Sequence, residues 1–138
     1  MGRYELLDHT ADIGIIVFGR DLPEAFSTAA FAMFDILTNI EEIKEIGKFD
    51  IQVSASNIEE LLVIWLDELL YRYETERLIF RRFAINSIND RNLSATVFGE
   101  KVNPARHEIR TEIKNVTYHQ LKVEKIDDGW KAQVIFDV

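Results

Sequence analysis

The chain has 138 residues, a formal net charge of −8 and no cysteine. This length suits one domain with its own core, and the lack of cysteine excludes disulfides, thiolate zinc sites and cysteine nucleophiles. An acidic surface repels phosphate groups, so strong direct binding to nucleic acid is disfavoured. The sequence contains neither a signal-peptide pattern nor an apolar run of about 18 residues, so we expect no membrane span and a cytoplasmic location.

The first half of the chain begins with two predicted strands and a helix. Tyr4–Leu7 and Ile13–Phe18 are short apolar segments on either side of a polar turn. Asp21 and Glu24 have the spacing of a capping box, and apolar residues then recur at steps of three and four. Phe49–Ala55 alternates between apolar and polar residues, which predicts a half-buried strand.

A second helix is predicted over Ile58–Glu76. Ser56 and Glu59 have capping-box spacing before it, and apolar residues cover most of its circumference. We therefore expect it to be the central buried helix. The core is expected to include Phe26, Met33, Phe34, Trp65 and Leu69.

The second half of the chain changes to a period of two, which is typical of strands. One hairpin is predicted to turn at Asn89–Asn92 and another at Asp127–Gly129, with a loop at Gly99, Asn103 and Pro104 between them. Two main helices packed on a mostly antiparallel β-sheet indicate an α+β fold. We expect residues 1–138 to form a single two-layer domain.

Polar residues gather where the first two predicted strands meet, at Asp8, His9, Thr10 and Asp12. A solvated turn would explain them, because Asp and Thr side chains accept hydrogen bonds from nearby backbone donors. Carboxylates also suit hard cations such as Ca²⁺, Mg²⁺ or Mn²⁺. The residues alone leave both interpretations open.

The last predicted strand ends in Asp137 and Val138. A frayed, solvated end would explain this pair. Alternatively, the Asp137 side chain and the main-chain carboxylate of Val138 could share one cation with Asp12.

The segment from His107 to His119 is polar and would ordinarily be a loop, with Lys114 exposed to solvent. The three histidines, His9, His107 and His119, allow a zinc site, but no i,i+4 pair makes one specific.

Three separated motifs resemble the archease family over the whole chain. Asp8–Gly14 is similar to its N-terminal signature, Glu112–His119 to its second signature and Phe136–Val138 to its acidic and apolar ending. The chain departs from the family pattern at Asn115, where alanine is common, and at Val138, where a larger aliphatic residue is common. Neither departure removes a polar group.

This resemblance implies an accessory protein and not an enzyme. Archeases assist RtcB-type RNA ligase, which joins RNA ends in tRNA splicing and repair, by promoting its guanylylation and multiple turnover and by broadening its nucleotide use. The family's metal-binding positions correspond to Asp12, Asp137 and Val138, with Ca²⁺ favoured and Mg²⁺ or Mn²⁺ as alternatives, and its important lysine corresponds to Lys114. The other signature residues expected to contribute are Asp8, His9, Tyr118 and His119.

Two other classes of function stay open. A metal-dependent hydrolase or nuclease could use Asp12 and Asp137, although the sequence has no dense acidic or histidine set. Turnover of phosphoesters by the isolated protein would favour that class. A chaperone-like interaction module would need no metal, and it would survive only if Asp12→Ala and Asp137→Ala left activity intact.

Overall fold

The computed structural model describes residues 2–7 and 12–138. Strands β1 and β2 join β6, β7 and β8 in a five-stranded sheet, while β3, β5 and β4 form a three-stranded sheet in that order, and neighbouring strands in both sheets run antiparallel. The elements in chain order are β1 (Arg3–Leu7), β2 (Ile13–Gly19), α1 (Leu22–Leu37), a 3₁₀ turn (Ile40–Glu42), β3 (Gly47–Ser54), α2 (Ile58–Glu76), β4 (Leu78–Ile88), β5 (Asn92–Lys101), β6 (Asn115–Val116), β7 (Lys122–Ile126) and β8 (Gly129–Asp137).

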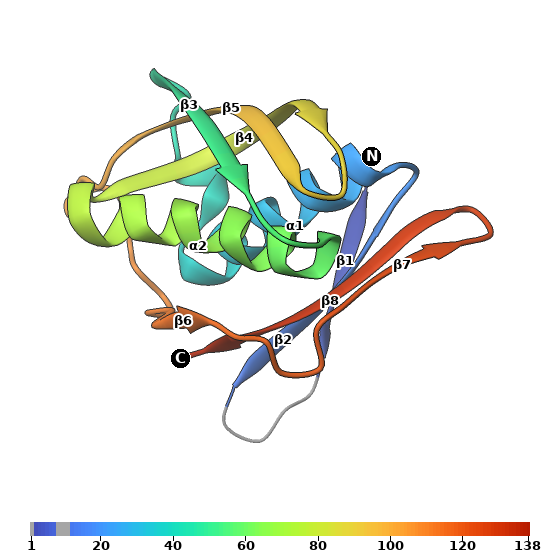
Figure 1. The fold of residues 1–138 in the computed structure, drawn as a ribbon. Coiled ribbons are helices and arrows are strands. Elements are labelled where there is room, and N and C mark those ends of the chain that lie inside the picture. The colour runs from blue at the N-terminus through green and yellow to red at the C-terminus, as the bar shows by residue number, and fades with distance from the viewer. Residues whose placement is uncertain (1, 8–11) are drawn as a thin grey trace.

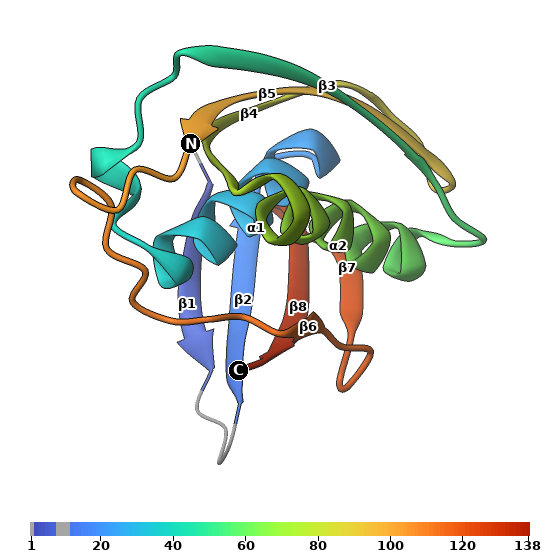
Figure 2. The ribbon, with the colours of Figure 1, turned by 90° about the vertical axis from the view of Figure 1, so that its left-hand side faces the viewer.

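The two helices lie between the two sheets (Figures 1 and 2). The predicted α+β class, the two main helices and the antiparallel pairing are confirmed. The number of layers differs from the expectation, because the strands divide into two sheets and the fold has three layers. A helix that is apolar around most of its surface needs cover on two sides, which one sheet cannot supply. In the described residues, neither helix is long and apolar enough to cross a membrane.

Helix α1 begins as predicted. The Asp21 carboxylate accepts a hydrogen bond from the Glu24 backbone N–H at 2.9 Å. The Glu24 carboxylate in turn accepts from the backbone N–H of Arg20 at 2.8 Å, one residue before the N-cap. Both contacts satisfy donors near the start of the helix, where intrahelical acceptors are lacking.

Helix α2 has the predicted bounds, but its N-cap lies one residue later than expected. The Asn57 side chain accepts from the Glu60 backbone N–H, and the Glu60 carboxylate accepts from the Ser56 backbone N–H, both at 2.8 Å. The predicted box of Ser56 with Glu59 is therefore wrong. Asn57 caps as well as serine does, and the same spacing recurs from it to Glu60.

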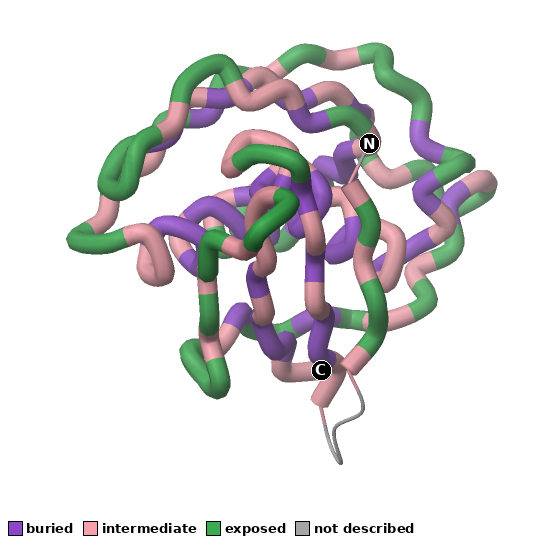
Figure 3. The backbone as a smooth tube through the Cα atoms, turned by 90° about the vertical axis from the view of Figure 1, so that its right-hand side faces the viewer, coloured by how far each residue is buried: buried purple, intermediate pink, exposed green. Residues whose placement is uncertain are grey.

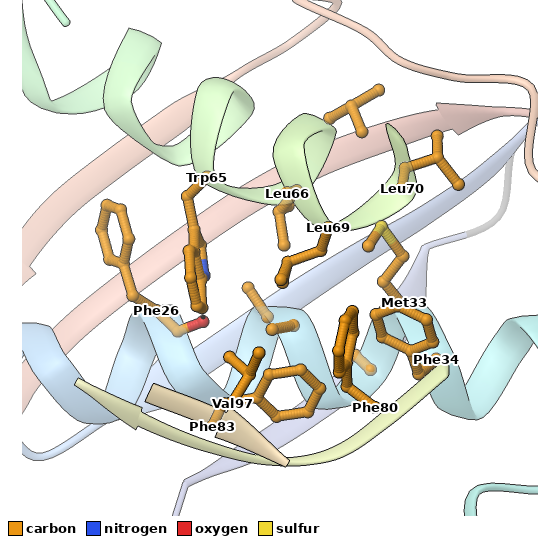
Figure 4. Packing of buried hydrophobic residues seen from close by; sticks show 14 of the residues in the cluster. Phe26, Met33, Phe34, Trp65, Leu66, Leu69, Leu70, Phe80, Phe83 and Val97 are labelled. Atoms are coloured by element: carbon orange, nitrogen blue, oxygen red, sulfur yellow. Dashed lines mark hydrogen bonds between the residues drawn. The ribbon is translucent and has the colours of Figure 1, made fainter. Parts of the chain in front are cut away.

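The predicted core residues of both helices are all buried, at 0% exposure (Figure 4). The Trp65 indole N–H donates to the Phe26 carbonyl oxygen at 3.0 Å, which satisfies a polar group that burial would otherwise leave unpaired. Phe34 contacts the three-stranded sheet, with its ring centroid 5.5 Å from that of Phe80 and 5.9 Å from that of Phe83. Buried segments accordingly concentrate between the sheets (Figure 3).

Two features of the second half differ from the prediction. Gly99 lies in strand β5 opposite Gly47, and not in a loop. A Cβ atom on Gly99 would come within 1.9 Å of the Ile79 carbonyl oxygen, so glycine is required by close approach of β4. The other feature is β6, a two-residue strand that pairs with the end of β8 within a segment predicted to be a loop.

Candidate functional site

The five-stranded sheet brings Asp12 and Asp137 to the same end. In the pairing of β2 with β8, Ile13 lies opposite Phe136. Asp12 directly precedes Ile13 and Asp137 directly follows Phe136, so the backbones of the two aspartates lie at the same end of this strand pair. The C-terminus lies beside the start of β2 (Figure 2).

Strand β6 brings Lys114 to this end from the other side of β8. The Lys114 backbone N–H donates to the Asp137 carbonyl oxygen at 2.7 Å. Asn115 pairs with Asp137, and its side-chain N–H donates to the Asp137 carboxylate at 3.3 Å. Val138 follows and packs against the core. We call Asp12, Lys114, Asn115 and Asp137 the Asp137 end.

The other signature residues lie elsewhere or outside the described residues. The backbone N–H and the hydroxyl of Thr117 both donate to the carbonyl oxygen of Ile135, which lies two residues before Asp137 in β8. Tyr118 follows Thr117 and so comes after this point. Tyr118 and His119 are exposed in the segment between β6 and β7. Asp8 and His9 are outside the residues that the structure describes.

A strap, residues 102–114, leads from β5 to the Asp137 end and crosses the ends of both helices (Figure 2). The backbone N–H groups of Arg110 and Thr111 donate to the Leu37 carbonyl oxygen at 2.8 and 3.3 Å, and the Thr38 hydroxyl donates to the Glu108 carbonyl oxygen. These bonds satisfy the carbonyl at the end of α1, which has no partner within the helix.

The strap is also tied to α2 by Tyr73. Its hydroxyl donates to the Glu112 carboxylate, with distances of 3.1 and 3.3 Å to the two oxygens. Tyr73 is 1% exposed. Burial, and then the charge of Glu112, raise the pKa of the Tyr73 phenol, so the hydroxyl stays a donor at neutral pH.

Where the strap begins, two of its residues form a closed polar cluster with the end of β5 and the segment before β3. We call this the Glu100 cluster: Glu100, Arg106, His107 and the backbone N–H of Lys44. The Glu100 carboxylate accepts from Arg106 at 2.6 Å and from Lys44 at 2.6 Å. The pKa of Glu100 falls to about 2, chiefly because Arg106 donates to it.

His107 is part of this cluster. Its Nδ1 accepts from the Asn103 backbone N–H at 2.8 Å, so the network assigns the ring hydrogen to Nε2, which donates to Glu100 at 3.0 Å. Both ring nitrogens are engaged and the side chain is fully buried, which argues against His107 as a zinc ligand.

The Asp137 end fits a hard cation by the chemistry of its groups. Two carboxylates, an amide and main-chain carbonyls supply the oxygen atoms that Ca²⁺, Mg²⁺ and Mn²⁺ prefer. Within residues 2–7 and 12–138, however, no three His, Cys, Asp or Glu side chains form a group that could hold a metal ion by themselves. If the ligands come from the described residues alone, an ion at this end would draw on amide or main-chain oxygen as well.

Comparison with known proteins gives a consistent result. Residues 4–138 match the model of the Archease protein family (MTH1598/TM1083). The archease of Methanosarcina mazei is 39% identical over 140 residues, covering 99% of this chain and 96% of that protein. The solution structure of Methanobacterium thermoautotrophicum protein 1598 has a TM-score of 0.81 at 33% identity, covering 98% of each chain.

A more distant structure shares the fold. The Thermotoga maritima archease, described as a possible chaperone, has a TM-score of 0.61 at 23% identity, covering 96% of this chain and 94% of that one. The family match over nearly the whole chain and the relatives above 30% identity establish the assignment: the chain belongs to the archease family.

Proposed function

We propose that this protein is an accessory factor of RtcB-type RNA ligase that promotes guanylylation and repeated turnover of the ligase. The family assignment supports an accessory role. The observation that carries the proposal is the pairing of β8 with both β2 and β6, which gathers Asp12, Lys114 and Asp137 at one end of a sheet. These residues come from three distant parts of the chain, and together they form a polar end directly after the buried residues Val134, Ile135 and Phe136 of β8.

We also propose that Asp12, Asp137 and Val138 hold a divalent cation, with Ca²⁺ favoured. When bound, the cation would stabilise the negative charge that guanylyl transfer gathers on phosphate oxygens. Asp12 and Asp137 supply carboxylate oxygens and Val138 supplies main-chain oxygen. Lys114 offsets the repulsion between the two carboxylates or contacts a phosphate. The net charge of −8 suits a basic, RNA-binding partner better than RNA itself.

A guanylylation time course with an RtcB-type ligase, GTP and divalent metal tests this function. The wild-type protein should raise the rate and permit repeated ligation, and alone it should neither ligate nor cleave RNA. Asp12→Ala and Asp137→Ala should each abolish the effect, and Lys114→Ala should reduce it. Deletion of Asp137 and Val138 should match Asp137→Ala. Asp128→Ala, an exposed acid in the β7–β8 turn, is the matched control.

The same experiment separates the other classes of function. Phosphoester turnover by the isolated protein would favour a metal-dependent hydrolase. Full stimulation of the ligase by a folded Asp12→Ala, Asp137→Ala double variant would contradict the metal mechanism. A chaperone-like interaction with the ligase would then be the remaining explanation. Circular dichroism confirms that each variant is folded.

A further inference from the structure

The bond between Tyr73 and Glu112 joins a buried helix position to an exposed strap residue. The Tyr73 ring belongs to the core, yet its hydroxyl reaches out to the Glu112 carboxylate at 3.1 Å. A phenylalanine would fill the same space without the need for a partner, so the hydroxyl is not required for packing. Its acceptor is charged, which makes this bond stronger than one between neutral groups.

Glu112 stands two residues before Lys114, with Ile113 between them. Ile113 is 2% exposed and packs into the core, and the Lys114 backbone N–H is bound to Asp137. Two residues of extended chain span at most roughly 7 Å, so a fixed Glu112 leaves little freedom for the backbone of Lys114. The three successive residues are thus held by a side-chain bond, a buried side chain and a backbone bond.

We propose that Tyr73 and Glu112 are positioning residues, which set the place of Lys114 at the Asp137 end. This inference rests on the proposed function for the role of Lys114, but the positioning itself does not need a ligase to be measured. Neither residue belongs to the cation-binding set proposed above.

Four variants of the full chain test the proposal. Tyr73→Phe keeps the ring and removes the donor, and Glu112→Ala removes the acceptor. Glu112→Gln is the conservative variant, because its amide oxygen still accepts from the phenol. Tyr73→Phe with Lys114→Ala tests whether the pair acts through the lysine. Two exposed residues give matched controls: Tyr71→Phe on the same helix and Glu108→Ala on the same strap, whose bond to Thr38 uses the backbone carbonyl.

The first readout is hydrogen exchange of the Lys114 amide, measured by NMR in the isolated protein. Tyr73→Phe and Glu112→Ala should each speed this exchange about 3- to 10-fold, the effect of losing one hydrogen bond. Glu112→Gln, which keeps a weaker neutral acceptor, should exchange more slowly than Glu112→Ala, and both controls should exchange at the wild-type rate. An unchanged Lys114 exchange rate in folded Tyr73→Phe would overturn the proposal.

The second readout is stimulation of ligase guanylylation. Tyr73→Phe and Glu112→Ala should lower it about 3- to 10-fold, and Glu112→Gln should lower it less than Glu112→Ala does. Tyr73→Phe should cause no further loss in a Lys114→Ala background. If the losses of stimulation from Tyr73→Phe and Lys114→Ala were additive in the double variant, the proposal that Tyr73 acts through Lys114 would be overturned. If wild-type protein stimulated no ligase while Lys114 exchange changed as expected, the proposed function would fail and the positioning would stand.

Discussion

The strap joins two polar regions that use the same chemical groups in opposite ways. In the Glu100 cluster, a carboxylate that is 9% exposed accepts from a guanidinium, an imidazole and a backbone N–H. At the Asp137 end, a half-buried carboxylate accepts from the neutral amide of Asn115. The first carboxylate accepts from charged and fixed donors, whereas the donor seen at the second, within residues 2–7 and 12–138, is a neutral amide.

This difference predicts that Glu100 contributes more to the stability of the fold than Asp137 does, and it is compatible with the role proposed for Asp137. A buried charge must be fully paired, because an unpaired one costs several kcal/mol. A half-buried charge at a strand end has a smaller desolvation cost, so the neutral amide contact seen among the described residues is enough to keep it in the fold. Four predictions follow this contrast from the largest expected effect to the smallest.

Glu100→Ala should lower the free energy of unfolding by about 3 kcal/mol, because Arg106, His107 and the Lys44 N–H all lose their acceptor. Asp137→Ala should change it by less than about 0.5 kcal/mol. Urea unfolding at neutral pH measures both. Equal effects from the two variants would contradict the distinction between the regions.

Saturating Ca²⁺ should stabilise the wild-type protein and not Asp137→Asn. At 100 times its Kd, a ligand that binds only the folded state adds about 2.7 kcal/mol to the free energy of unfolding. Thermal unfolding with and without Ca²⁺ measures this gain, and a chelator should reverse it. Mg²⁺ and Mn²⁺ serve as parallel titrations, and equal stabilisation of Asp137→Asn would place the ion elsewhere.

Acid should destabilise the protein partly through Glu100. The fold lowers the pKa of Glu100 from 4.5 to about 2, so the unfolded chain binds the proton more readily. The stability that this carboxylate contributes is complete above about pH 5.5 and is lost as the pH falls from there through 2. Glu100→Gln should therefore flatten the acid limb of a stability–pH curve, whereas Asp128→Asn should leave the limb unchanged.

Asn115→Ala should raise the Kd for Ca²⁺ about threefold, because the Asp137 carboxylate loses the amide that orients it. Isothermal titration calorimetry resolves this difference. Asn86→Ala, which removes an exposed amide bonded to Thr96 on the other sheet, is the control. A Kd unchanged by Asn115→Ala would show that the amide is incidental.

Much of the fold is predictable because it follows from local periodicity. Helix α2 has the predicted bounds, since its apolar positions recur over 19 residues. The prediction of its cap is wrong by one residue because Ser56 and Asn57 are adjacent and both cap well. The division of the strands into two sheets is not predictable in this way, because it depends on which strands pair with each other. Strand β6 is not predictable either, because a two-residue strand carries no periodic signal and exists only through its pairing with β8.

The candidate site is predictable in part. The sequence predicts that Asp12 and Asp137 lie near each other, and the register of β2 with β8 places them at one end, while the binding of an ion by both stays a prediction. The contact of Asn115 with Asp137 escapes sequence reasoning, since it depends on β6. The role of His107 escapes it too, because burial of a loop histidine requires a partner such as Glu100, which lies seven residues earlier.

Strand β8 lies between β2 on one side and β6 with β7 on the other, and it follows all four other strands of its sheet in chain order. During synthesis on the ribosome, the hairpin of β4 and β5 and both helices emerge well before it. The five-stranded sheet can therefore close only after β8 has emerged, through contacts of high sequence separation that form slowly. A nascent chain stopped before β8 would carry Lys114 without Asp137, so the Asp137 end is assembled last, together with the fold itself.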